Sequence, residues 1–356
     1  MTTMRRLLPL LLAIAAVLAC KRTEPVPEPR AVPPAEHGAA IYAKMCAVCH
    51  GAAGEGYKAD EATALAHPDF LTAVNDDYLK NAITNGRSGT TMSSWGSSRG
   101  GPLAPSDVAD VVAHIRTWDD PKKPRAALDD KPPAGDALRA EAIFEKECVK
   151  CHGAHGTGGP NVHIGSPEFL TSASNGLLRL AIKKGRVGTP MPAFEATLGE
   201  EKIEDLVTLL RSWELPPVVR AAATAPPIPL GPVPLNPHGP EPEGFKVQPA
   251  TTSVDVVKAA LDKGAKLAIL DARAPPDYTT EHIAGAVSVP FYDPSPYIPK
   301  LPRDAWLVCY CACPHAESGQ LAQKLTDAGF KKVTILDEGL NVWRNKKYGT
   351  HTGDKP

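Results

Sequence analysis

Two stretches of the chain place apolar residues on one face of a predicted helix. The positions follow the spacing i, i+3, i+4, i+7 and i+10, which brings them to one side of an α-helix. The first stripe consists of Val108, Val111, Val112, Ile115 and Trp118, and the second of Ile203, Leu206, Val207, Leu210 and Trp213. We expect each helix to bury this face in a helical core.

The two stripes close two copies of one sequence repeat. A shift of 99 residues lays residues 68–92 on residues 167–191. The identical positions include Phe-Leu-Thr, Ala-Ile, Gly-Arg, Gly-Thr and a final Met. This internal similarity predicts two related helical domains.

A different pattern follows near the C-terminus. Leu267–Asp271, Trp306–Tyr310 and Val333–Leu336 are short continuous apolar runs, typical of strands that are buried on both faces. Leu321 and Leu325 mark a helix between the last two runs. Short buried strands that alternate with helices predict an α/β domain with a central parallel sheet.

Proline-rich segments separate the folded regions. The chain contains 37 prolines, and many of them cluster in stretches that lack hydrophobic periodicity and favour extended linkers. The predicted division is a signal peptide at 1–19, a tether at 20–35, a helical domain at 36–120, a linker at 121–135, a second helical domain at 136–215, a linker at 216–248, an α/β domain at 249–350 and a tail at 351–356.

Charge narrows the class of partner. With 39 Lys and Arg against 40 Asp and Glu, the formal net charge is −1. Proteins that bind nucleic acid usually carry a strong positive excess, because they neutralise phosphates. We therefore expect no nucleic-acid partner.

Two cysteine motifs carry the most specific chemistry. Cys46-Ala-Val-Cys49-His50 and Cys148-Val-Lys-Cys151-His152 both have the form C-x-x-C-H. Two thiols at this spacing can each add to a haem vinyl group, and the following His can then reach the iron. A redox dithiol or half of a zinc site also begins with C-x-x-C. Two copies, each followed by His and each inside a repeat, favour two covalently bound haem c groups.

These segments resemble class I cytochromes c, over nearly all of 36–118 and 136–213. The resemblance implies small all-α domains whose first and last helices cross beside the haem. It also implies a methionine as the second axial iron ligand, opposite the histidine. Met92 and Met191 are the candidates, because they occupy the same position in the two repeats. His/Met ligation is typical of electron transfer rather than of gas binding at an open iron.

The sequence alone allows more than one role for several residues of the repeats. The methionines could be ordinary core residues, and His67, His155 and His163 are rival iron ligands that do not recur in both copies. Arg87 and Arg186 do recur. A haem propionate, a loop carbonyl and plain surface charge are the interpretations that stay open for them.

The N-terminus carries an export pattern. Two arginines, Arg5 and Arg6, precede a short apolar run, which is typical of a secretory signal and too short to span a bilayer comfortably. The run ends in Val-Leu-Ala-Cys20, which resembles a bacterial lipobox. The resemblance implies cleavage before Cys20 and a lipid anchor there, so we expect a periplasmic or cell-envelope location. An ordinary cleaved signal is the alternative.

The C-terminal segment resembles rhodanese-like domains over roughly 250–348. The residues that carry the resemblance are Asp271, Arg273, Asp277, Tyr278, Glu281, His282, Ile283, Gly285, Ala286, Gly329, Phe330, Val333, Glu338, Gly339, Leu340 and Trp343. In that family a Cys after the central strand attacks a sulfane sulfur and forms a persulfide. Cys311 stands at that position, Cys313 and His315 follow it, and Cys309 is expected to be a buried strand residue. The loop departs from the family, because Ala316 and Glu317 stand where an Arg is usual.

Three roles remain open for this domain: persulfide chemistry at Cys311 with Cys313 resolving, a redox or metal-handling role of the Cys-x-Cys pair, and an inactive binding module. The fold expected for the whole chain is multidomain, with two small all-α cytochrome c domains and one α/β rhodanese-like domain. The expected function is dihaem electron transfer coupled to sulfane-sulfur chemistry, with redox proteins and a sulfur compound as partners. The alternative is a pure electron shuttle whose C-terminal domain docks a partner.

Overall fold

The computed structural model describes residues 32–56, 62–87, 89–158, 161–186, 189–214, 231–312 and 315–356. The predicted signal segment, Cys20, most of the tether and Cys313 lie outside these residues. The tether was expected to reach residue 35, but helix α1 already begins at Pro34, since proline suits the first turn of a helix. Within the described part of the chain, no helix is long and apolar enough to cross a membrane.

The first repeat is entirely helical apart from its loops. Its elements are α1 (Pro34–Met45), α2 (Ala47–His50), α3 (Pro68–Ala73), α4 (Asp76–Asn85) and α5 (Pro105–Arg116). Asn75 begins α4, because its side chain accepts a hydrogen bond from the Tyr78 N–H and so caps the helix. This confirms the all-α class for this region.

The second repeat has the same order of α-helices and one additional 3₁₀ helix. It consists of α6 (Ala137–Glu147), α7 (Val149–His152), the short 3₁₀ helix η1 (Ala154–Gly156), α8 (Pro167–Ser172), α9 (Asn175–Lys184) and α10 (Glu195–Ser212). Ser174 caps α9 as Asn75 caps α4, by accepting from the Leu177 N–H. The correspondence of helices supports the repeat that the sequence predicted.

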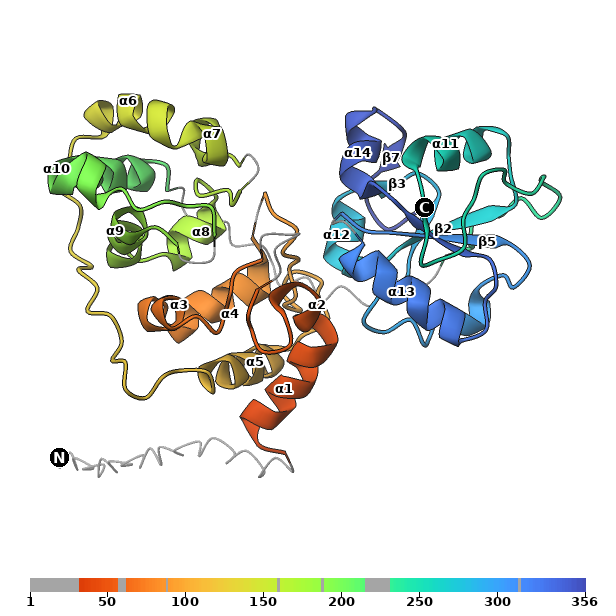
Figure 1. The fold of residues 1–356 in the computed structure, drawn as a ribbon, viewed down its shortest axis with the longest axis horizontal. Coiled ribbons are helices and arrows are strands. Elements are labelled where there is room, and N and C mark those ends of the chain that lie inside the picture. Colours follow the sequence, from red (N-terminus) through yellow and green to blue (C-terminus); the bar gives the residue numbers. More distant parts are fainter. Residues whose placement is uncertain are drawn as a thin grey trace, which may run out of the picture. The chain divides into compact units, whose positions relative to one another are not determined.

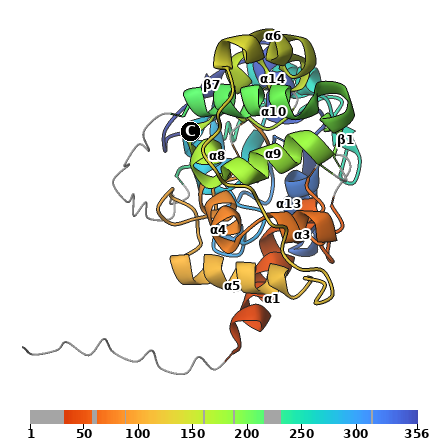
Figure 2. The ribbon, with the colours of Figure 1, turned by 90° about the vertical axis from the view of Figure 1, so that its left-hand side faces the viewer.

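The first and last long helices of each repeat pack together, as Figure 2 shows for α1 and α5 and for α6 and α10. Both apolar stripes are buried, apart from Trp118 and Trp213 at their ends, which are partly buried; Val111 and Ile203, for example, have no exposed surface. The close approach in the first repeat depends on Gly38. An added Cβ there would lie 1.9 Å from the Asp110 carbonyl oxygen. At the equivalent place the second repeat has Ala140, which is fully buried.

A buried aspartate ties each helix pair together. In the first repeat, Asp110 accepts from His37 Nδ1 at 2.8 Å. In the second, Asp205 accepts two hydrogen bonds from the Arg139 guanidinium at 2.7 Å and one from the Asp136 N–H. The Asp205 side chain is 1% exposed. The contact in the second repeat is a two-point ion pair, and charge on both groups strengthens each of its hydrogen bonds.

The C-terminal region is an α/β domain with a five-stranded parallel sheet (Figure 1). The strand order is β1-β6-β5-β2-β4, and two further strands, β3 and β7, form a short antiparallel pair. The strands are β1 (Thr251–Thr252), β2 (Leu267–Asp271), β3 (His282–Ile283), β4 (Ala286–Ser288), β5 (Trp306–Tyr310), β6 (Val333–Leu336) and β7 (Thr350–His351). The three runs predicted as strands are β2, β5 and β6, with the same bounds.

Helices cover both faces of this sheet. They are α11 (Val254–Asp262), α12 (Pro275–Thr280), η2 (Ile298–Lys300), α13 (Ala316–Asp327) and α14 (Gly339–Asn345). Alternate strand residues face opposite sides: Ile269 and Val308 pack with α11 and α14, whereas Leu270 and Cys309 pack with α13. The domain therefore has a core on each face, which explains the continuous apolar runs in the sequence.

Part of the segment predicted as the last linker belongs to this domain. Asn236 donates from its side-chain amide to the Gly264 carbonyl, Glu241 pairs with Lys332, and the Gln248 N–H donates to the Val333 carbonyl. Residues 236–248 thus lie along the α/β domain. The sequence did not predict these contacts, because the segment is rich in proline and because hydrogen bonds made by irregular backbone leave no periodic pattern.

Candidate functional sites

Each C-x-x-C-H motif lies at a break between two helices. Cys46 stands between α1 and α2, and Cys148 stands between α6 and α7. The short helix that follows ends at the histidine of the motif, His50 or His152. One helical turn therefore carries the second cysteine and the histidine of each motif, as covalent attachment and ligation of one haem require.

The histidines are oriented in the same way in both repeats. His50 Nδ1 lies 2.9 Å from the Thr63 carbonyl oxygen, and His152 Nδ1 lies 3.0 Å from that of Val162. A ring that donates from Nδ1 presents its Nε2 lone pair as the metal ligand. Burial lowers the pKa of both histidines, which keeps the imidazole in the neutral form that can bind a metal.

The methionine loops also close in the same way. The Met92 carbonyl accepts from the Arg87 N–H at 3.0 Å, and the Met191 carbonyl accepts from the Arg186 N–H at 3.1 Å. The hydroxyl of a threonine two residues earlier accepts from each methionine N–H. Both methionine side chains pack against the buried core of the protein. The structure thus brings the two predicted ligands into equivalent loops, although the first lacks the prolines that flank Met191.

A glycine makes each of these loops possible. Gly86 and Gly185 end α4 and α9 with φ of 69° and 68°, a region that other residues rarely adopt. An added Cβ would lie 2.5 Å from the Met92 carbonyl oxygen or 2.6 Å from that of Met191. The Gly-Arg pair that recurs in the sequence is therefore part of the turn that presents the methionine.

Arg87 provides an independent test of whether a haem fits. Its guanidinium lies 4.5 Å from the centre of the Tyr78 ring, and two of its nitrogens are buried without a hydrogen-bond partner among the described residues. A buried guanidinium is costly unless it meets an anion. Haem carries two anionic propionates, so a haem in the first repeat would supply the kind of partner that Arg87 lacks.

The rival histidines have other contacts. His67 caps α3 by accepting from the Asp69 N–H, and the His155 ring packs 5.9 Å from that of Trp213. His163, the third rival ligand, lies against Gly89 of the first methionine loop.

In the α/β domain, Cys311 directly follows strand β5 and is fully buried. Its Sγ lies 3.3 Å from the Ser318 hydroxyl, in the first turn of α13. The start of a helix favours a thiolate, because the N–H groups and the helix dipole stabilise negative charge. The backbone of Gly339 packs closely against Cys311. Gly339 has φ of 65°, and an added Cβ would lie 2.6 Å from the Cys311 carbonyl oxygen.

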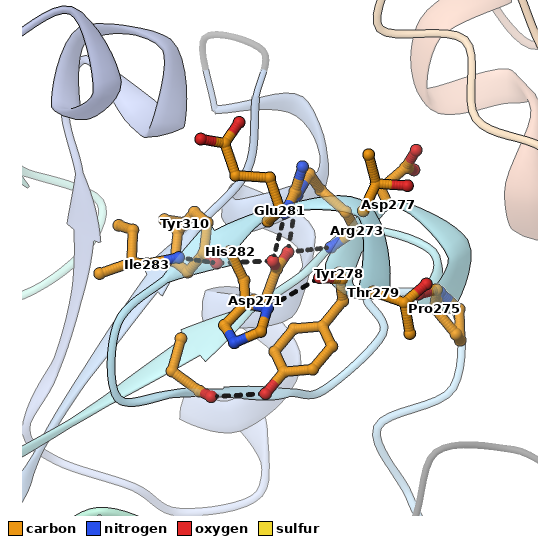
Figure 3. Close-up of polar contacts among 12 residues, drawn as sticks. Asp271, Arg273, Pro275, Asp277, Tyr278, Thr279, Glu281, His282, Ile283 and Tyr310 are labelled. Carbon is orange, nitrogen blue, oxygen red and sulfur yellow. Dashed lines mark hydrogen bonds and ion pairs between the residues drawn. The ribbon is translucent and has the colours of Figure 1, made fainter. Parts of the chain in front are cut away.

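Arg273 is the buried cation of this region, and it is already paired. Figure 3 shows its guanidinium and the Tyr310 hydroxyl converging on the Asp271 carboxylate. Arg273 donates to the two Asp271 oxygens at 2.9 and 2.6 Å and also to the Glu281 carbonyl. These residues of the first rhodanese signature therefore hold β2 and the following loop in place.

His315 points toward the end of β6. Its Nε2 lies 2.5 Å from the Asp337 carbonyl oxygen and 3.1 Å from the Asp337 carboxylate. Its φ of 67° places it in the left-handed region, directly before α13. Cys309 is fully buried in β5, and burial raises the pKa of its thiol, in agreement with the expected core role.

Comparison with known families agrees with this geometry. Residues 33–115 and 135–210 match the family of the cbb3-type cytochrome c oxidase subunit III, and residues 253–346 match the rhodanese-like domain. The chain is therefore a protein with two cytochrome c domains followed by a rhodanese-like domain. Cytochrome c domains imply covalently bound haem c and a role in electron transfer.

Individual proteins resemble separate parts of the chain. The cbb3-type cytochrome c oxidase subunit FixP of Bradyrhizobium diazoefficiens is 28% identical over 49% of this chain and 59% of its own length. The chain thus spans about three fifths of that relative. The probable adenylyltransferase/sulfurtransferase MoeZ of Mycobacterium tuberculosis is 33% identical over 23% of the chain and 21% of its own length. A rhodanese-like domain from Anabaena is 26% identical, covers 30% of this chain and 80% of its own, and has a TM-score of 0.28.

Sequence reasoning missed several residues that shape these sites. Thr63 and Val162 lie beside the predicted axial histidines and contact them through backbone carbonyls, which no side-chain motif reveals. Thr63 and Val162 are 99 residues apart, as the two methionines are, and this equivalence in the repeat is the sequence feature that could have identified them. The sequence places Glu317 where an Arg is usual but does not predict its burial, and the structure shows that Glu317 is buried.

Proposed function

We propose that the protein is a dihaem electron carrier in which both irons have one histidine and one methionine ligand. The observation that carries this proposal is the duplication of the whole ligand frame. Each repeat has a partly buried histidine within hydrogen-bond distance of a backbone carbonyl, and each has a methionine loop closed by the N–H of an equivalent arginine. Such agreement in two copies supports a shared cofactor better than any single residue does.

The chain's residues have distinct roles in this proposal. Cys46, Cys49, Cys148 and Cys151 form the thioether bonds to the two haems. His50 and His152 are the first axial ligands, oriented by the Thr63 and Val162 carbonyls. Met92 and Met191 are the second axial ligands. One-electron exchange at iron is the chemistry that a bound haem c supplies, and a methionine ligand raises its potential.

Near-infrared spectra of the oxidised protein test the ligand assignment. A charge-transfer band from thioether to iron should be present, and Met92→Ala and Met191→Ala should each remove part of it. Both substitutions together should remove the band completely. A band that is absent, or that survives the double substitution, would reject methionine ligation.

We also propose that the protein is exported and lipid-anchored at Cys20, after removal of residues 1–19. The basic and apolar pattern of the N-terminus supports this. The anchor would hold the haem domains in the periplasm or cell envelope, where redox proteins can exchange electrons with them. Mass spectrometry of membrane-extracted protein should detect an acylated Cys20 as the first residue. A soluble mature protein cleaved elsewhere would contradict the anchor.

For the C-terminal domain we propose sulfane-sulfur chemistry at Cys311. The position of this thiol between β5 and the start of α13 supports the role of a nucleophile that forms a persulfide. Cys313 would resolve or pass on that sulfur, and His315 would shape the loop through its bond to Asp337. The haems would accept two electrons, one each, if the Cys311 persulfide and a second hydropersulfide were oxidised to a tetrasulfide with loss of two protons, and the haems would then pass these electrons to a redox partner.

Haem reduction by a sulfur compound distinguishes sulfur chemistry at Cys311 from the alternative, a domain that only docks a partner. If the domain is a sulfur site, an uncharged hydropersulfide should reduce the haems of the full protein, and Cys311→Ser should abolish that reduction. If the domain only docks a partner, the rate of reduction should not change in the variant. The second outcome would leave a pure electron shuttle as the better account.

A further inference from the structure

The two cytochrome c domains contact each other through the same pair of residues in each. Both domains belong to one compact unit, Pro34–Pro356. The Arg87 guanidinium carbon of the first domain lies 5.8 Å from the centre of the Phe169 ring in the second. The Arg186 guanidinium carbon of the second domain lies 5.3 Å from the centre of the Phe70 ring in the first. The two arginines, like the two phenylalanines, are 99 residues apart, so the contact is reciprocal, as in a two-fold arrangement of like surfaces.

The segment that joins the two domains is hydrogen-bonded to both of them. Ala126 donates its N–H to the Thr72 carbonyl of the first domain at 2.9 Å. On the other side, the Asp130 carboxylate accepts from the Gly176 N–H of the second domain at 2.8 Å. The linker predicted at 121–135 is therefore attached to each domain, which supports the contact between them.

Each of these arginines also closes the methionine loop of its own domain. The Arg87 N–H donates to the Met92 carbonyl, and the Arg186 N–H donates to that of Met191. Both guanidinium groups lie within the distance of about 6 Å at which a cation is attracted to an aromatic face. The backbone of one residue therefore holds a methionine loop while its side chain contacts the other domain. A change at the contact can reach the methionine loop of the opposite domain through this single residue.

The interface also brings positive charge from both domains to one buried residue. Tyr78 is buried, and the Arg87 guanidinium carbon lies 4.5 Å from the centre of its ring. Burial raises the pKa of Tyr78, but the charges of Arg87 and Arg186 outweigh burial and lower it. Two buried nitrogens of Arg87 have no hydrogen-bond partner among the described residues. Cations from both domains are therefore available to the anionic propionates of a haem.

We propose that Arg87 and Arg186 are positioning residues that couple each iron site to the opposite cytochrome c domain. Each guanidinium, held over the phenylalanine of the other domain, fixes the methionine loop that its backbone closes and keeps positive charge near the haem of its own domain. Positive charge disfavours ferric iron, so it raises the potential of that haem. This inference rests on the dihaem function proposed above and adds a regulation of the same two sites.

The test exchanges each phenylalanine for leucine in the full-length protein with both haems attached. Leucine keeps an apolar side chain but removes the aromatic face. We expect Phe169→Leu, in the second domain, to lower the potential of the first haem. Phe70→Leu, in the first domain, should lower the potential of the second haem. Because Coulomb interactions weaken with distance, each shift should be on the order of threefold larger at the opposite haem than at the haem of the substituted domain.

Potentiometric titration measures both potentials. Single-haem variants, in which serine replaces both cysteines of one C-x-x-C-H motif, assign each potential to its domain. Phe330→Leu is the matched control, because it removes a contact of the same kind, with the Arg303 guanidinium carbon at 3.9 Å, in the rhodanese-like domain. Both potentials should keep their wild-type values in this control.

Arg87→Lys keeps the test valid if a leucine variant does not fold. Lysine keeps the charge but lacks the planar group that lies over the ring. The potential of the first haem should fall in Arg87→Lys as it does in Phe169→Leu. The double variant should lower it no further, because both substitutions break one contact. Shifts that simply add in the double variant would overturn the coupling.

The outcomes separate the inference from the proposed function. A shift confined to the haem of the substituted domain would overturn the coupling, because it would show that each phenylalanine acts locally. Unchanged potentials in both leucine variants would overturn it as well and would leave the dihaem function intact. A wild-type protein without bound haem would reject the proposed function, and the inference with it.

Discussion

The two cytochrome c domains agree closely at the predicted iron sites and differ where their helices cross. The bonds that orient His50 and His152 differ in length by 0.1 Å, and so do those that close the two methionine loops. At the helix crossing, however, the first domain uses His37 and Asp110, and the second uses Arg139 and Asp205. Groups that orient ligands must keep their geometry, whereas a helix pair needs only close contact and a satisfied buried charge.

The largest effect should come from the helix crossing of the first domain. Gly38→Ala places a methyl group 1.9 Å from the Asp110 carbonyl oxygen, which is backbone and cannot move aside. We expect the free energy of unfolding of this domain to fall by about 3 kcal/mol or more. Ala140→Gly, the matched change in the second domain, should cost about 1 kcal/mol through helix propensity.

Denaturant unfolding followed by the absorbance of the haems measures both variants. Equal losses in the two domains would show that the crossing in the first domain is not as tight as the structure indicates. A Gly38→Ala protein as stable as the wild type would contradict the packing of α1 on α5 directly.

The methionine loops come next in size. Met92→Ala and Met191→Ala should each lower the reduction potential of one haem by an amount on the order of 0.1 V, within the range of about 0.8 V that axial ligands span. The reason is that the thioether favours ferrous iron. Potentiometric titration with two resolved haems measures this. An unchanged potential in either variant would show that the methionine of that loop is not an iron ligand, and that the two loops are not equivalent.

The buried aspartates give a smaller effect on stability. Asp205→Asn should cost about 2 kcal/mol, because the Asp205 carboxylate accepts charge-assisted bonds from Arg139. Asp110→Asn, the matched change in the first domain, should cost about 1 kcal/mol, because it weakens the hydrogen bond with the His37 imidazole. The matched pair is measured by chemical unfolding at neutral pH. A larger loss in Asp110→Asn would reverse the ranking of the two ties.

The Asp205–Arg139 ion pair predicts that stability depends on pH. The hydrogen bonds from Arg139 hold the pKa of Asp205 below its usual range. The contribution of Asp205 to stability is therefore fully present above the pKa of an unfolded aspartate. That contribution is lost as the pH falls through the lower pKa of the folded state. The stability difference between wild type and Asp205→Asn should therefore shrink in acid, and a constant difference would contradict the ion pair.

Arg87 should have the smallest effect. Its buried guanidinium has no hydrogen-bond partner among the described residues and is expected to meet a propionate, so Arg87→Gln should lower the potential of the first haem by less than the loss of Met92 does. Arg186→Gln is the matched change in the second repeat. A redox titration of both variants resolves the two haems. No shift in Arg87→Gln would place this side chain outside the haem environment.

Much of the fold could be predicted because it depends on local periodicity. The strands β2, β5 and β6 appear as uninterrupted apolar runs, and the stripes of α5 and α10 follow the helical period. The short strands β1 and β3 could not be predicted, since two residues carry no pattern. The packing of residues 236–248 depends on hydrogen bonds from irregular backbone, which the sequence does not encode in a readable form.

The sites divide in the same way. The C-x-x-C-H motifs and the paired methionines can be located in the sequence, because the chemistry of a haem site would fix their identity and spacing, and their roles stay a prediction. The carbonyl groups of Thr63 and Val162 could not, because any residue can supply a carbonyl. Glu317 could be located in the sequence, but its burial depends on how α13 packs on the sheet.

The account as a whole depends on one haem being bound to each C-x-x-C-H motif. The most direct measurement is the intact mass of the protein, made in a host with a cytochrome c maturation system. The wild type should carry the mass of two haems, and Cys46→Ser/Cys49→Ser and Cys148→Ser/Cys151→Ser should each retain one. A wild-type protein with the mass of the polypeptide alone and no Soret absorbance would contradict the account.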